Sequence, residues 1–269
     1  MPLATFQQDD HLGEIVIDSP PQNLYNAQLL ADLRAAVDEA AGSDIRALLL
    51  RAEGDDFSAG AELTVFIGID ENQARELSST VLSLIAAIED LPVPTLALIH
   101  GQCYAGALET CLACDLRIGQ RGDFRYGNPE VRAGVIPGAG GTQRVTRLVG
   151  LARALEWVLR GRIVRPEVAF DLGLVHELVN DAPSRALELA EEIACLPPMS
   201  VANAKRALYL GADANLQAAF EIENMAWTEV MQSDDAQLAL KTFIAVDPDS
   251  RRDWFESENS KNYPAYAGH

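Results

Sequence analysis

Lysine is almost missing from this chain of 269 residues, which contains only Lys205, Lys241 and Lys261. The formal net charge is −19, so arginine supplies nearly all of the positive charge. A charge of this sign argues against binding of nucleic acid or of an anionic membrane through a basic surface. We therefore expect no nucleic-acid partner and no membrane partner, and a polyanionic ligand would need a local cluster or backbone N–H groups.

Long apolar runs and a disulfide framework are also missing. The longest apolar runs, residues 47–50 and 96–99, are far too short to cross a bilayer. The first residues contain neither a basic region nor a long apolar stretch, so no signal peptide is expected. The four cysteines do not have the spacing typical of a disulfide-bonded framework. This favours reduced thiols and a cytoplasmic location.

The hydrophobic pattern indicates an α/β core followed by helices. In the α/β core, strands are predicted at residues 12–18, 45–50 and 95–100. Helices of the core are predicted at residues 27–41 and 71–90. Further predicted helices span residues 184–195, 200–210, 216–231 and 235–246. We therefore expect an α/β core with the active site at residues 1–195 and a helical C-terminal region with a tail at 196–269. Residues 247–269 show no period, which leaves open whether they pack as an arm.

Three segments are richer in glycine and small residues than core packing requires. They are FSAGAEL at residues 57–63, HGQCYAGALE at residues 100–109, and YGNPEVRAGVIPGAGGT at residues 126–142. Small residues at strand-to-helix turns let backbone N–H groups approach a ligand, and a helix N-terminus favours developing negative charge there. Two such turns brought together would form an oxyanion hole.

In this order and spacing, the three segments resemble the enoyl-CoA hydratase/isomerase family, also called the crotonase superfamily. The resemblance covers the chain up to about Val179. It implies a crotonase-like ββα spiral core, with the C-terminal helices as an oligomerisation region. It also implies an acyl-CoA thioester substrate, with coenzyme A as part of the substrate and no separate cofactor.

The resemblance assigns roles to individual residues. Glu109 and Glu130 match the two catalytic carboxylates of the family's hydratases, Glu109 for activating water and Glu130 for protonating the α-carbon. Ala61 and Gly106 match the positions whose N–H groups form the oxyanion hole. The surrounding residues match a loop along the adenine end of coenzyme A, and the substrate-binding residues expected there are Ala59, Gly60, Glu62 and Leu63.

Ordinary structural interpretations compete with these roles. A glutamate in a helix is usually solvated, but Glu109 stands in a nearly apolar helix, where burying an unpaired carboxylate is costly unless it faces a site. Glu130 follows Pro129 and also fits a common acid at a helix start. Cys111 and Cys114 have the spacing of a redox or metal pair, but no partner ligands stand nearby, which favours core packing. We therefore expect no metal site.

Two other functions remain open. A Δ3,Δ2-enoyl-CoA isomerase, or another acyl-CoA reaction of the family, needs chiefly one carboxylate, whereas hydration is better served by two, so Glu109 and Glu130 together favour a hydratase. An RNA-binding relative would need a lysine-rich helix, and residues 71–90 contain no lysine and a single arginine, Arg75.

Assembly is the remaining expectation. The C-terminal helices carry more apolar side chains than a small appendage can bury, namely Leu187, Leu189, Ile193, Leu208, Phe220, Ile222 and Trp227. Together with the family resemblance, these apolar faces predict a homotrimer or a dimer of trimers.

Overall fold

The computed structural model describes residues 1–256 and 263–268. Its strands are β1 (Ala4–Asp9), β2 (Leu12–Ile17), β3 (Ala47–Ala52), β4 (Thr95–Ile99), β5 (Cys103–Tyr104), β6 (Leu116–Gln120), β7 (Tyr126–Gly127), β8 (Ile163–Val164) and β9 (Glu177–Val179). Six of them form one sheet in the order β1-β2-β3-β4-β6-β9, and β5-β7-β8 form a small second sheet. In the large sheet only β1 and β2 are antiparallel, as expected for a core built from strand–helix units.

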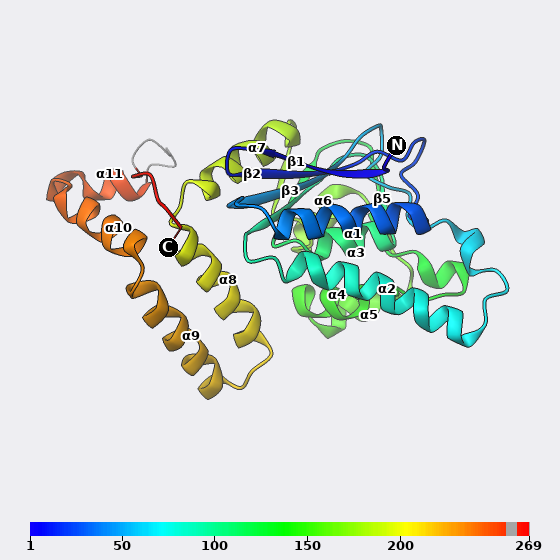
Figure 1. Ribbon diagram of the computed structural model, residues 1–269. Helices are drawn as coiled ribbons and strands as arrows, with labels where there is room; N and C mark the ends of the chain where they lie inside the picture. The colour runs from blue at the N-terminus through cyan, green and yellow to red at the C-terminus, as the bar shows by residue number, and fades with distance from the viewer. Residues whose placement is uncertain (257–262, 269) are drawn as a thin grey trace.

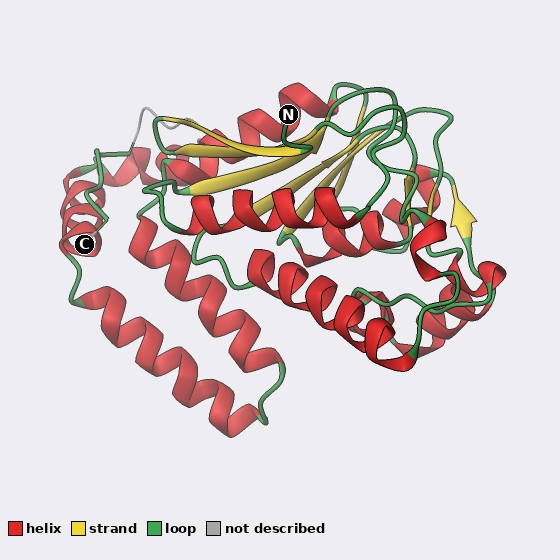
Figure 2. Ribbon diagram, turned by 45° about the vertical axis from the view of Figure 1, so that its right-hand side comes forward, coloured by secondary structure: helices red, strands yellow, loops and turns green. Residues whose placement is uncertain are grey.

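The helices cover both faces of the large sheet (Figure 2). They are α1 (Ala27–Ala41), α2 (Glu71–Glu89), α3 (Gly106–Ala113), α4 (Gly141–Val149), α5 (Leu151–Leu159), α6 (Pro166–Asp171), α7 (Ala182–Ala194), α8 (Pro198–Ala212), α9 (Leu216–Met231), α10 (Asp234–Ala245) and α11 (Arg251–Glu256). Three short 3₁₀ helices are η1 (Leu63–Phe66), η2 (Glu130–Ala133) and η3 (Pro248–Ser250).

Alternation along β3 explains why both sheet faces are buried. Leu48 and Leu50 join the core beneath α1, whereas Ala47 and Leu49 join a second cluster beneath α7. On α7, the small residues Ala182, Ala186 and Ala190 recur every four positions and are fully buried, which lets this helix lie close to the strands. No helix in the described ranges is both long and apolar enough to cross a membrane.

The predicted mixed α/β architecture with C-terminal helices is confirmed. The helices predicted at residues 27–41 and 216–231 have the predicted bounds, whereas the strand predicted at residues 45–50 lies at 47–52. The sequence pattern missed β1. This strand pairs with another strand on one side only and is half exposed, so its side chains do not show the apolar pattern of a buried strand.

Helices α8 to α11 project away from the sheet (Figure 1). From its middle and its C-terminal half, α8 is fixed to the core by an ion pair of 2.8 Å between Lys205 Nζ and Asp115 and by a hydrogen bond of 2.8 Å from Tyr209 Oη to the same carboxylate. Two residues expected among the apolar faces of this region, Leu189 and Ile193, instead pack against the sheet, because they lie on α7. The boundary predicted between residues 195 and 196 stays a prediction.

The last described residues of the tail pack against α10. The N–H groups of Ala267 and Gly268 donate to the Asp235 carboxylate at 2.8 and 2.7 Å, and Tyr266 is 5% exposed. Residues 266–268 therefore pack as an arm, which is one of the two possibilities that the sequence left open. Residues 257–262 and 269 lie outside the described residues.

Candidate active site

The first two small-residue segments lie side by side. Ser58 and Cys103 form a parallel bridge, Tyr104 N donates to Ser58 O at 3.1 Å, and a Cβ on Gly60 would stand 3.2 Å from that of Ala105. Gly60 and Ala105 each immediately precede a residue predicted for the oxyanion hole. Within the described part of the chain, neither Ala61 N nor Gly106 N donates a hydrogen bond. The fold thus brings together two backbone donors from segments 45 residues apart.

The turn into α3 is strained at Ala105. Its φ of 51° and ψ of −129° place an alanine where L-residues are uncommon, a conformation that costs about 1–3 kcal/mol. The strain accompanies the placement of Gly106 as the first residue of α3. A Cβ on Gly106 would meet no atom within 4 Å, so the space beside this residue is open.

The residues predicted to bind substrate belong to the loop that carries Ala61. Ala59 N donates to Gln22 O at 3.0 Å, and the φ of Gly60 is +99°. Glu62 is the N-cap of η1 and accepts a hydrogen bond from Thr64 Oγ1 at 2.7 Å, and Leu63 is 58% exposed. The contact of Ala59, Gly60, Glu62 and Leu63 with coenzyme A stays a prediction.

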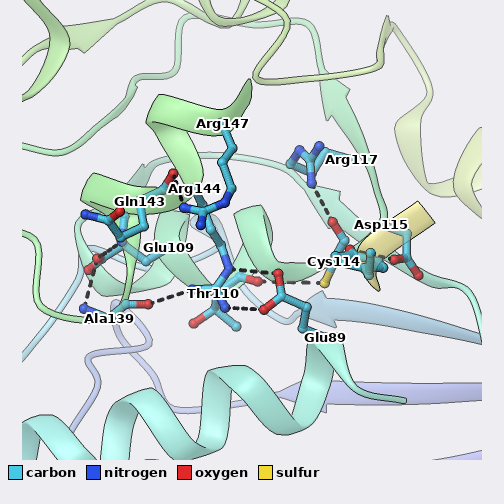
Figure 3. Close-up of polar contacts among 12 residues, drawn as sticks. Glu89, Glu109, Thr110, Cys114, Asp115, Arg117, Ala139, Gln143, Arg144 and Arg147 are labelled. Atoms are coloured by element: carbon cyan, nitrogen blue, oxygen red, sulfur yellow. Dashed lines mark hydrogen bonds and ion pairs between the residues drawn. The ribbon is translucent and has the colours of Figure 1, made fainter. Parts of the chain in front are cut away.

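Glu109 is buried on α3, one helical turn after Gly106. Its Oε1 accepts hydrogen bonds from Ala139 N at 2.9 Å and from Gly141 N at 2.6 Å (Figure 3). Burial, opposed by the Gly141 N–H and reinforced by the negative charge of Glu130, raises the pKa of Glu109 to about 7. The carboxyl group is therefore poised to exchange a proton near neutral pH.

Glu130 comes to the same site from η2. Its Oε1 accepts a hydrogen bond of 3.1 Å from Asn128 Nδ2, whereas its buried Oε2 has no hydrogen-bond partner among the described residues. Burial also raises the pKa of this carboxyl group. Gly127 O, three residues before Glu130, accepts a hydrogen bond of 2.9 Å from Ala105 N, so the segment that carries Glu130 lies against the turn into α3, and the charge of Glu130 raises the pKa of Glu109.

Trp157 orients the amide that holds Glu130. Its Nε1–H, which can only donate, bonds to Asn128 Oδ1 at 2.9 Å. The amide oxygen of Asn128 is thereby turned toward Trp157, and its NH₂ group toward Glu130. Trp157 is 1% exposed on α5, so this support for Glu130 is part of the core. Neither residue was predicted to be functional from the sequence, although Asn128 stands in the third segment.

Two glycines of the third segment, Gly140 and Gly141, shape the loop that donates hydrogen bonds to Glu109. The sequence suggested that small residues there let backbone N–H groups approach a ligand; instead, in this structure the N–H groups of Ala139 and Gly141 approach a glutamate side chain. A Cβ on Gly141 would stand 2.7 Å from Glu109 Oε1, so only glycine permits this contact. Gly140, with φ of +93°, turns the chain between the two donors.

The hydrogen bonds of the Cys111, Cys114 and His176 side chains are to groups other than Glu109 and Glu130. Cys111 and Cys114 are buried, as predicted, and burial raises the pKa of Cys111 well above that of a free thiol. His176 accepts a hydrogen bond from Arg117 N at 3.2 Å, and burial lowers its pKa to about 4. Among the described residues no cluster of three or more His, Cys, Asp or Glu side chains has an arrangement that could hold a metal ion.

The chain is similar in sequence and in fold to known enoyl-CoA hydratases. The family model for "Enoyl-CoA hydratase/isomerase" matches residues 7–249. The enoyl-CoA isomerase/hydratase fer4 of Mycosarcoma maydis is 36% identical over 200 residues, which is 74% of this chain and 73% of that protein. The short-chain-enoyl-CoA hydratase of Clostridium acetobutylicum is 27% identical over 243 residues, which is 88% of this chain and 93% of that protein.

Solved structures extend the similarity to the whole fold. The crystal structure of an enoyl-CoA hydratase from Bacillus anthracis superposes with a TM-score of 0.88 and 30% sequence identity, covering 99% of this chain and 100% of that one. A structure from Geobacillus kaustophilus HTA426 gives a TM-score of 0.90 at 27% identity, covering 100% of this chain and 98% of that one.

Proposed function

The chain belongs to the enoyl-CoA hydratase/isomerase, or crotonase, family, and on that premise we propose that it is a 2-enoyl-CoA hydratase. The observation that carries the proposal is the pair of buried carboxyl groups of Glu109 and Glu130, whose pKa values are raised by burial. Glu109 follows Gly106 by one helical turn, Glu130 follows β7, whose Gly127 O accepts a hydrogen bond from Ala105 N, and the loop holding Ala61 lies alongside the same turn. Addition of water to a conjugated thioester needs an acid, a base and stabilisation of an enolate oxygen, and these groups supply all three.

The thioester oxygen is proposed to lie between the N–H groups of Ala61 and Gly106. As hydroxide adds to the β-carbon, electrons move from the double bond toward this oxygen, and two preorganised donors stabilise the negative charge. In serine hydrolases, removing one such donor costs about 3–4 kcal/mol. The Gly106 donor lies at the N-terminus of α3, whose dipole favours the same charge.

The proposed base is Glu109 and the proposed acid is Glu130. Two N–H donors on Oε1 favour the ionised form of Glu109, which removes a proton from the attacking water. Glu130 has one amide donor and one unpartnered oxygen, and apolar carbon of a bound acyl chain would raise its pKa further. Glu130 then gives its proton to the α-carbon, and proton exchange with solvent restores both groups.

The function is tested with purified protein and two substrates, crotonyl-CoA and 3-hexenoyl-CoA. We expect loss of enoyl absorbance with crotonyl-CoA and a product heavier by one water. Isomerisation of 3-hexenoyl-CoA without hydration of crotonyl-CoA would make the chain an isomerase, and inactivity on both substrates would contradict the proposal.

We further propose that the protein forms a closed homo-oligomer, a trimer or a dimer of trimers. Three large apolar side chains of the C-terminal helices, Leu208, Phe220 and Trp227, are 73%, 60% and 63% exposed in the single chain. Surfaces of this kind on a soluble protein mark contacts with another chain. Light scattering at micromolar concentration is expected to give the mass of three or six chains, and a monomer would contradict the proposal.

A further inference from the structure

The loop that donates to Glu109 is held from its other side by an arginine. Arg144 lies on α4 and donates from Nη1 to Ala139 O at 3.2 Å (Figure 3). This carbonyl belongs to the peptide between Ala139 and Gly140, and the peptides on either side of it donate to Glu109. A Cβ on Gly140 would stand 2.1 Å from Arg144 Nη1, so the guanidinium lies directly against the loop.

Arg144 is itself fixed by a carboxylate from another helix. Its Nε and Nη2 donate to the two oxygens of Glu89, the last residue of α2, at 3.3 and 2.6 Å. The side chains of Arg144 and Glu89 are 15% and 27% exposed, so this two-bond pair is screened less than a surface pair. All three guanidinium nitrogens are therefore engaged, two by α2 and one by the loop.

We propose that Arg144 is a positioning residue for Glu109, fixing the loop that donates to this carboxylate and placing a positive charge beside it. The inference rests on the proposed function, in which Glu109 must be ionised to accept a proton from water. Glu130 and Arg144 are charged groups that act on the pKa of Glu109, and Glu89 is paired with Arg144. The positive charge of Arg144 lowers the pKa of Glu109, opposing burial and Glu130.

The two halves of the ion pair give opposite predictions. Arg144→Met removes the positive charge and leaves Glu89 unneutralised, so the Glu109 pKa should rise by about one pH unit. Glu89→Gln leaves Arg144 unneutralised, so the pKa should fall. If the pair served only to hold the loop, both variants would loosen the Ala139 and Gly141 donors, and both would raise the pKa.

The experiment measures the Glu109 ionisation directly by ¹³C NMR of the protein labelled in its glutamate carboxyl groups, with Glu109→Gln used to assign the signal. The acid limb of the pH profile of kcat/KM should move in the same direction. Because the NMR titration needs no turnover, it still tests Arg144 if the hydratase proposal fails.

Two further variants complete the test. Arg144→Lys keeps the charge and should leave the Glu109 pKa within about half a unit of wild type while weakening the loop. Arg147→Met is the control, because Arg147 is on the same helix and its pair with Asp213, 3.2 Å long, is exposed at the surface. Shifts of the same sign in Arg144→Met and Glu89→Gln, or an equal shift in Arg147→Met, would overturn the proposal.

Discussion

Glu109→Gln and Glu130→Gln are each expected to lower kcat for hydration by about 10²–10⁴, the usual contribution of a positioned acid or base. KM should change little, because the proposed thioester contacts come from backbone N–H groups that neither substitution removes. The double variant should lose less than the product of the two effects, since groups that act as one unit are not additive. Steady-state kinetics with crotonyl-CoA measure all three variants.

Stability distinguishes a catalytic loss from misfolding in the Glu109 variant. The folded pKa of about 7 lies above the ordinary value of 4.5, so ionisation is disfavoured in the folded state. The contribution of Glu109 to the stability of the wild type should therefore fall as pH rises from about 4.5 to 7 and then level off. Glutamine carries no charge, and its side-chain oxygen can still accept from Ala139 and Gly141. Glu109→Gln should accordingly match the wild type near pH 4.5 and exceed it at pH 8 by up to about 3 kcal/mol.

Calorimetric unfolding at both pH values measures this difference. An inactive variant that is also less stable at pH 8 would point to a structural role for Glu109. If Glu109→Gln abolishes hydration but leaves double-bond migration intact, Glu130 is the working base and the chain is an isomerase. Full activity of both single variants would exclude a catalytic role for Glu109 and Glu130. Only the fold assignment would then stand.

Gly141→Ala is expected to lower kcat by roughly 10²-fold, the loss that a displacement of about 1 Å causes in a catalytic group. The added Cβ would stand 2.7 Å from Glu109 Oε1 and 2.8 Å from its Cγ, so the carboxylate must move away from both of its N–H donors. Alanine is favourable near a helix start, and Gly141 begins α4, so the backbone itself should tolerate the change.

Gly138→Ala is the matched control in the same loop. A Cβ there would meet only Ile136 O, at 3.8 Å, which is an ordinary contact, and Gly138 has no positive φ. It should therefore keep most of the activity. Combining Gly141→Ala with Glu109→Gln should cost little beyond Glu109→Gln alone, because the clash acts through this side chain. If the losses of activity in the double variant are additive, or if Gly138→Ala and Gly141→Ala lose equal activity, Gly141 supports activity otherwise than through the position of Glu109.

The sequence by itself determined the mixed α/β class, the C-terminal helices and the family. Apolar spacing reports which face of a segment is buried, and that preference is local, so the helix at residues 27–41 was predicted with its observed bounds. The three small-residue segments also carried the candidate site, because backbone approach at a turn needs glycine or alanine at particular positions. Glu109 and Glu130 were identified from these segments.

The tertiary structure alone decided how these residues are supported. Ala139 N meets Glu109 across 30 residues of chain, Trp157 meets Asn128 across 29, and Arg144 meets Glu89 across 55. No local sequence pattern predicts these contacts, because each joins two segments that only the fold brings together. The sequence therefore shows where a carboxylate stands, but its proton affinity depends on burial and on charges that arrive from distant segments.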